Sequence, residues 1–146
     1  MAVRAPEPYV RILVPVSVDV SPDEAMAVAC RLAAERGAVI SILAAIEVPP
    51  ELPLYAQMPS EEDEAQQALV EARAVAELYG VSVSARVVRA RAAAEAIVER
   101  AVDEGAQLVV LGAPRRRRAS GAVPLFGRTV TGVLAQAPCR VMVAAR

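Results

Sequence analysis

The chain has 146 residues, the length of a single domain that can bury a sizeable core. Hydrophobic residues make up 55% of the chain and aromatic residues only 3%, so the core must be built from aliphatic side chains. The formal net charge of -1 argues against a generally basic nucleic-acid-binding protein. No stretch reaches the roughly 20 uncharged apolar residues that span a bilayer, and the start of the chain lacks the apolar segment of a signal peptide. We expect a disordered lead over residues 1–9, one domain over residues 10–146 and a cytoplasmic protein without direct membrane insertion.

The first third of the chain predicts two buried strands with a helix between them. Val10–Val16 and Ala38–Val48 are apolar runs rich in β-branched residues, as in strands buried on both faces. Between them, Ser21–Glu24 predicts a helix start with a capping box, and Gly37 predicts the helix end. The proline-rich segment Pro49–Pro59 cannot be regular structure, because proline lacks an amide donor, so we expect a loop there and a candidate mobile lid.

The rest of the chain continues the alternation of helices and strands. Ser60 and the acidic residues after it predict a helix that ends at Gly80. Val81–Val87 alternates polar and apolar residues, which suits an edge strand. A helix, a strand, a short helix and a last strand are then predicted at Ala92–Gly105, Gln107–Gly112, Gly127–Ala137 and Cys139–Ala145. Strands separated by helices of this length predict an α/β fold with a single open, parallel, five-stranded sheet.

Four consecutive arginines, Arg115–Arg118, follow the fourth predicted strand. In an open parallel sheet, ligands bind beyond the carboxyl ends of the strands, where the strand order reverses. If strands one and four are neighbours, the loop Pro15–Ser21 and the arginine segment flank one crevice. Gly112 would allow a sharp turn or close approach of a ligand, and the helix that begins near Gly127 would present unpaired amide groups to an anion. A solvated surface loop remains the alternative interpretation of the arginines.

Side chains near this crevice could add to an anion site. Arg128 and the arginine segment can form charge-assisted bonds to phosphate, and the hydroxyl of Thr129 can donate to a phosphate oxygen. Asp19 is a candidate ligand for a Mg²⁺ ion that accompanies ATP, although a role in the turn at the helix entry is the alternative. The sequence has no motif for a dedicated metal site.

Dedicated enzyme chemistry is not expected. The chain has no histidine, which removes the commonest general base. Several hydroxyl side chains have no obvious partner that would activate them as nucleophiles: Ser17, Ser120, Thr129 and Thr131. Cys30 and Cys139 are single and far apart in the sequence, as expected for reduced thiols.

Three segments of the chain carry a resemblance to a known family: "RILVPVSVDVSPDEAMAVACRLAAERGAVISIL", "AQLVVLGAPRRRR" and "FGRTVTGVLAQAPCRVMV". From Val10 to Val143 the sequence resembles the universal stress protein family. The resemblance implies five parallel strands in the order 3-2-1-4-5 with helices on both faces, an adenine-nucleotide alpha-hydrolase-like fold. Strands one and four are then neighbours, as the crevice requires.

The sequence departs from the pattern of the nucleotide-binding members. Those members carry a glycine after strand four, a second glycine three positions later, and then a Gly-Ser or Gly-Thr pair. Gly112 and Gly127 match the first and last glycines, whereas Arg115 stands at the second and Arg128 at the serine, with Thr129 just behind. The gap of eleven residues between Arg115 and Gly127 is longer than the family's usual spacing.

The loop after the first strand departs as well. The family usually reads Pro-Val-Asp there, with the aspartate facing the nucleoside. In this chain Pro15 and Val16 match, Ser17 replaces the aspartate, and Asp19 lies two residues further on. The loss of an acid and the gain of arginines make the expected crevice more positive, which favours an anionic ligand.

The resemblance implies an adenine nucleotide, ATP or AMP, held by a sensor or regulatory module in the stress response, with Mg²⁺ as a companion of ATP. The backbone near Pro15, Val16 and Ala45 would meet the base. The expected contact residues are Pro15, Val16, Ser17, Asp19, Ala45, Leu111, Gly112, Arg115, Arg116, Gly127, Arg128, Thr129 and Val130.

Other roles stay open. Family members commonly pair through the last strand, so a homodimer through Val141 and Val143 is expected. The sequence also resembles universal-stress-type domains found as cytosolic tails of amino-acid permeases. The rival hypothesis is therefore a nucleotide-free interaction module, its pocket filled by arginines, that docks on a transporter or another stress protein. Nucleic-acid binding by the arginine run is a weaker idea, and would predict steep salt dependence.

Overall fold

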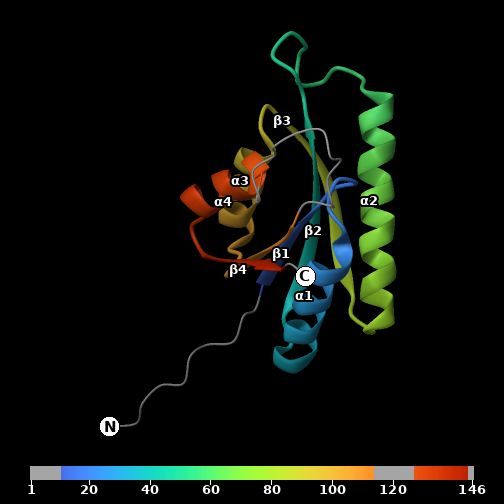
Figure 1. Ribbon diagram of the computed structural model, residues 1–146, viewed down its shortest axis with the longest axis vertical. Helices are drawn as coiled ribbons and strands as arrows, with labels where there is room; N and C mark the ends of the chain where they lie inside the picture. Colours follow the sequence, from blue (N-terminus) through green and yellow to red (C-terminus); the bar gives the residue numbers. More distant parts are fainter. Residues whose placement is uncertain (1–10, 114–126, 145–146) are drawn as a thin grey trace, which may run out of the picture.

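The computed structural model describes residues 11–113 and 127–144 (Figure 1). The elements are β1 (Arg11–Val16), α1 (Pro22–Arg36), β2 (Val39–Glu47), α2 (Pro59–Leu78), β3 (Val83–Ala90), α3 (Ala93–Glu104), β4 (Leu108–Gly112), α4 (Gly127–Gln136) and β5 (Arg140–Ala144). The strands form one parallel sheet in the order β3-β2-β1-β4-β5. The expected α/β class and strand order are confirmed. The expected lead, residues 1–9, lies outside the described residues.

Helices cover both faces of the sheet, which forms the middle layer (Figure 1). α1 and α2 pack on one face and α3 and α4 on the other, so two apolar clusters form. Alternation along β1 divides its side chains between them: Ile12 and Val14 face the α1–α2 side, and Leu13 faces the α3–α4 side. Both clusters are almost entirely aliphatic, as the composition requires.

The start of α1 differs in one detail from its prediction. Pro22 is the first helical residue and Gly37 ends the helix in the left-handed region, where its N–H donates to the carbonyl of Ala33 at 2.7 Å. Ser21 occupies the N-cap position, but its side chain makes no capping hydrogen bond, so the expected capping box does not form. The helix start needs this cap less than most, because Pro22 has no N–H that requires an acceptor and the acidic residues of the first turn complement the helix dipole.

Two boundaries also differ from prediction. α2 begins at Pro59, with Met58 as its N-cap, one residue before the expected Ser60. β3 runs from Val83 to Ala90 rather than from 81 to 87, because it pairs with β2 as far as Glu47↔Ala90. Pairing with the longer strand β2 therefore sets the bounds of β3, which lie further along the chain than the alternating pattern predicted.

The loop between β2 and α2 is tied to β3. Arg91 donates from Nη1 to the carbonyl oxygens of Pro49 and Leu52 at 2.6 and 2.7 Å, and Arg89 donates to the carbonyl of Ala56 at 2.7 Å. The prediction of a loop is confirmed. Arginine side chains bond to the loop backbone at several points, and the mobility expected of a lid stays a prediction.

Candidate functional site

Two adjoining cavities lie at the carboxyl ends of the strands, where the chain order reverses between β1 and β4. The first has a volume of about 210 Å³ and a mainly apolar lining, and the second about 270 Å³ and a mainly polar one. Together they fall within the roughly 300–1,000 Å³ usual for small-molecule sites. A crevice at this switch point is where an α/β sheet of this order binds ligands.

Most of the expected contact residues gather around the first cavity, although they come from four separate segments: β1 with the loop after it, β2, β4 and α4. Those that line it are Pro15, Val16, Ser17, Asp19, Ala45, Leu111, Gly112, Gly127, Arg128, Thr129 and Val130. Arg115 and Arg116 lie outside the described residues. The structure thus places these groups together, while ligand contact by each of them stays a prediction.

Gly112, the last residue of β4, has a packing role at the cavity. A Cβ atom on Gly112 would lie 2.5 Å from Cγ1 of Val20 and 3.2 Å from the carbonyl oxygen of Ser21. The end of β4 and the loop after β1 therefore approach each other too closely for a side chain. Because glycine has no side chain, it allows the end of β4 and the loop after β1 to pack directly against each other.

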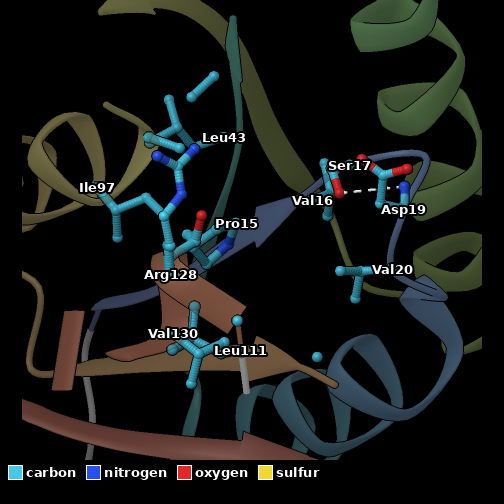
Figure 2. Close-up of a pocket in the computed structure, with 15 residues that line it drawn as sticks. Pro15, Val16, Ser17, Asp19, Val20, Leu43, Ile97, Leu111, Arg128 and Val130 are labelled. Carbon is cyan, nitrogen blue, oxygen red and sulfur yellow. Dashed lines mark hydrogen bonds between the residues drawn. The ribbon is translucent and has the colours of Figure 1, made fainter. Parts of the chain in front are cut away.

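The loop after β1 is held by its own polar groups. The backbone N–H of Asp19 donates to Oγ of Ser17 at 3.3 Å, and the N–H of Val20 donates to the carbonyl of Ser17 at 3.3 Å. Ser17, which replaces the family's aspartate, thus shapes the turn in addition to lining the cavity. In Figure 2, Ser17 and Asp19 lie on the opposite side of the cavity from Arg128.

The first turn of α4 forms another wall. Gly127 has φ +67°, in the left-handed region that favours glycine, and α4 begins there. Arg128 follows with a side chain that is 89% exposed, and its Nη2 lies 3.6 Å from Oε1 of Glu47. Thr129 is half-buried and lines both cavities. A helix start, a residue with a guanidinium and a residue with a hydroxyl therefore line one space, a combination suited to an anion.

The second cavity is acidic. Four carboxylate residues line it: Asp19, Glu47, Glu61 and Glu64. Arg128 is the only basic residue among the described residues that line either cavity. Over the described part of the chain, the crevice is therefore not the electropositive notch expected from the sequence. That expectation rested on the segment Arg115–Arg118, which lies outside the described residues.

Sequence reasoning missed several residues that line the crevice, above all Glu47. Glu47 is two residues beyond Ala45 on β2, and side chains two apart on a strand share a face. Ala45 was expected at the site, and the same alternation is the signal that could have identified Glu47 as well. Ala93 and Ile97 of α3 also line the first cavity, and no local pattern marked them.

The two cysteines lie away from the cavities. Cys30 is fully buried in α1, and Cys139 is half-buried just before β5; both are free thiols. Burial raises the pKa of both thiols, which disfavours the reactive thiolate. Among residues 11–113 and 127–144, no group of three or more His, Cys, Asp or Glu side chains could hold a metal ion.

Comparison with known proteins identifies the family. The sequence model of the universal stress protein family matches residues 8–145. The chain belongs to the universal stress protein family. This membership confirms the resemblance seen in the sequence and agrees with the observed strand order. No curated protein matches the chain at a significant level.

Solved structures of other family members share the fold. A universal stress protein from Archaeoglobus fulgidus is 20% identical, with a TM-score of 0.76, and the match covers 93% of this chain and 98% of that one. The universal stress protein from Archaeoglobus fulgidus in complex with dAMP is 17% identical, with a TM-score of 0.74, covering 94% and 98%. A universal stress protein in complex with cAMP is 23% identical, with a TM-score of 0.65, covering 94% and 97%. Within the described ranges of this chain, no helix has the length and apolar character needed to cross a membrane.

Proposed function

We propose that this universal stress protein binds an adenine nucleotide in the crevice between β1 and β4 and acts as a regulatory module rather than an enzyme. One observation carries the proposal: residues from four sequence-distant segments, each predicted from the sequence to contact a nucleotide, line a single cavity. Structural relatives in complex with dAMP and cAMP support the same ligand class. A role as a sensor in the stress response follows from the family and belongs to the proposal.

The lining of the cavity suggests an orientation for the ligand. Apolar side chains of Leu43, Ile97 and Leu111 offer a surface for the base, beside the backbone of Pro15 and Ala45. The opposite end of a nucleotide, its phosphate, would then meet the first turn of α4. Ligand sites of this kind pair an apolar wall with a few polar groups that fix orientation.

The phosphate would be held by the start of α4. Gly127, Arg128 and Thr129 line the cavity, so backbone amides of this turn, a guanidinium and a hydroxyl would contact the phosphate. Arg115 and Arg116 are further phosphate contacts on sequence grounds alone. Mg²⁺ enters only with ATP, bound mainly through the phosphates, since the described residues offer no ready-made metal site.

A thermal shift panel tests the proposal. ATP, AMP, cAMP, dAMP and adenosine are added to the wild-type protein, and at 100-fold excess over Kd a bound nucleotide should raise Tm by roughly 5–10 °C. R128A should weaken AMP binding about 5- to 10-fold or more, because a charge-assisted hydrogen bond is lost. Adenosine, which has no phosphate, should bind both proteins alike. R31A, which removes an exposed arginine on α1, is the matched control.

A flat response to every ligand would contradict nucleotide binding. It would favour the nucleotide-free interaction module that docks on a transporter or another stress protein. Mass spectrometry of small molecules released from the purified protein separates the two cases further, since a nucleotide carried through purification would appear directly. A combined R115A/R116A variant tests whether these two arginines add to phosphate affinity.

A further inference from the structure

One carboxylate, that of Glu47, joins three elements at the mouth of the crevice. Glu47 ends β2, and its Oε2 accepts a hydrogen bond from the backbone N–H of Ala93, the first residue of α3, at 2.9 Å. Its Oε1 lies 3.6 Å from Nη2 of Arg128, the second residue of α4. The carboxylate of Glu47 therefore occupies a position between two helix starts and a guanidinium.

The bond to α3 holds this carboxylate in place independently of Arg128. The N-cap residue of α3, Ala92, has extended backbone and no side chain that can cap the helix. Glu47 supplies that missing acceptor from another element, and its negative charge lies at the positive end of the α3 dipole. If Arg128 turned away, the carboxylate would stay at the crevice.

The ion pair between Glu47 and Arg128 is weak enough for a ligand phosphate to replace Glu47 as the partner of Arg128. The side chain of Arg128 is 89% exposed, the side chain of Glu47 is 43% exposed, and 3.6 Å is long for an ion pair. Exposed pairs of this kind contribute little to stability. A phosphate offers more oxygen acceptors and more charge than a carboxylate, so it can take the guanidinium in a bidentate bond.

We propose that Glu47 is an internal competitor for the phosphate of the ligand and a determinant of ligand charge selectivity. This inference rests on the proposed function. Glu47 engages the arginine that would bind phosphate, and after the exchange it remains nearby as a repelling charge. The other carboxylates of the second cavity, on Asp19, Glu61 and Glu64, have the same sign. The crevice thereby disfavours ligands in proportion to their negative charge.

The substitution Glu47→Gln tests this directly. Glutamine is isosteric and keeps a carbonyl oxygen that can accept from the N–H of Ala93, so the helix cap is retained. We expect E47Q to bind AMP about 3- to 10-fold more tightly in EDTA, because an exposed ion pair and a repulsive charge are removed together. The gain should be smaller for cAMP, which carries one charge fewer, and absent for adenosine. Isothermal titration calorimetry measures all three.

Two controls make the result specific. E99Q removes a charge on the exposed side of α3 and changes the net charge equally, and it should leave AMP binding unchanged. In the R128A background, the gain from E47Q should shrink, because the competition for the guanidinium no longer exists. Circular dichroism melts of each variant verify that the fold is retained, and E47N provides a second neutral side chain if E47Q melts early.

The outcomes separate this inference from the proposed function. If the wild-type protein binds AMP and E47Q binds no more tightly, or gains no more than E99Q, the competitor role is wrong and nucleotide binding stands. If neither protein binds any nucleotide, the proposed function fails and the competitor role fails with it. A gain of the same size for adenosine as for AMP also overturns the inference, since adenosine carries no phosphate.

Discussion

Two glycines, Gly112 and Gly132, mark places where two elements meet without room for a side chain. Gly112 meets the loop after β1 through Val20, and Gly132 of α4 would place a Cβ atom 2.7 Å from the Cβ of Ala94 on α3. The first contact closes the crevice from the β4 side, and the second sets α4 close against α3. The second contact bears on the position of α4, at whose start the phosphate is expected.

Gly112→Ala should destabilise the protein. The added methyl would lie 2.5 Å from Cγ1 of Val20, so either Val20 or the loop after β1 must shift. Overpacking of this kind costs about 1–3 kcal/mol, which urea unfolding measures as a lower midpoint. V20A in the same chain should recover part of the loss, because it removes the clashing methyl group. An unchanged midpoint for G112A would show that the loop moves freely, and would contradict the packing role.

At the scale of elements, the carboxyl end of β3 organises the loop that follows β2. Arg89 and Arg91 donate to four carbonyl oxygens of that loop, and Arg89 also pairs with Glu62 of α2. The loop itself contains two turns, in which Leu52 and Ala56 donate back to prolines three residues earlier. These hydrogen bonds connect the backbone of the proline-rich segment to the end of β3.

Arg91→Ala should loosen this loop without unfolding the domain. Its guanidinium bonds to the carbonyls of Pro49 and Leu52 are lost, whereas the loop buries little apolar surface of its own. Hydrogen exchange followed by mass spectrometry should show roughly tenfold faster exchange over residues 50–58, with less than about 1 kcal/mol change in global stability. R86A, which removes an exposed arginine of β3, is the matched control. Equal exchange in R91A and wild type would mean that the turns alone hold the loop.

At the scale of the whole molecule, β5 is an edge strand of the sheet. It pairs with β4 on one side only, as the last strand in the order. Val141 and Val143 are half-buried against the α3–α4 cluster, while Met142 is 38% exposed on the opposite face. Exposed edges are often covered by a second chain, so we propose a homodimer through β5, with the strand backbone and Met142 at its centre.

Met142→Lys should weaken that dimer. Two lysines brought together across the interface repel each other and cost desolvation, while the half-buried valines keep their packing. Size-exclusion chromatography with light scattering at micromolar concentration should give the dimer mass for the wild type and the monomer mass for M142K. L78K, at an 85% exposed position on α2, should behave like the wild type. A wild-type protein that elutes as a monomer would rule out the interface.

The sequence by itself determined the elements, the parallel sheet and the edge at which the crevice lies. Buried apolar runs and helical periodicity are local patterns, and the carboxyl ends of parallel strands necessarily share one edge. The strand order implied by the resemblance to the universal stress protein family made strands one and four neighbours, and with it Pro15, Gly112 and Arg128 were expected around one crevice.

Only the tertiary structure decided which side chains meet across that edge. The register that extends β3 to Ala90, the approach of Gly112 to Val20 and the bridge from Glu47 to Ala93 and Arg128 all join segments far apart in the chain. Such contacts depend on side-chain separations of a few ångströms, which packing of the whole domain sets and no local pattern encodes. For the same reason the acidic character of the second cavity, formed by β2, α2 and the loop after β1, emerged only when those elements were brought together.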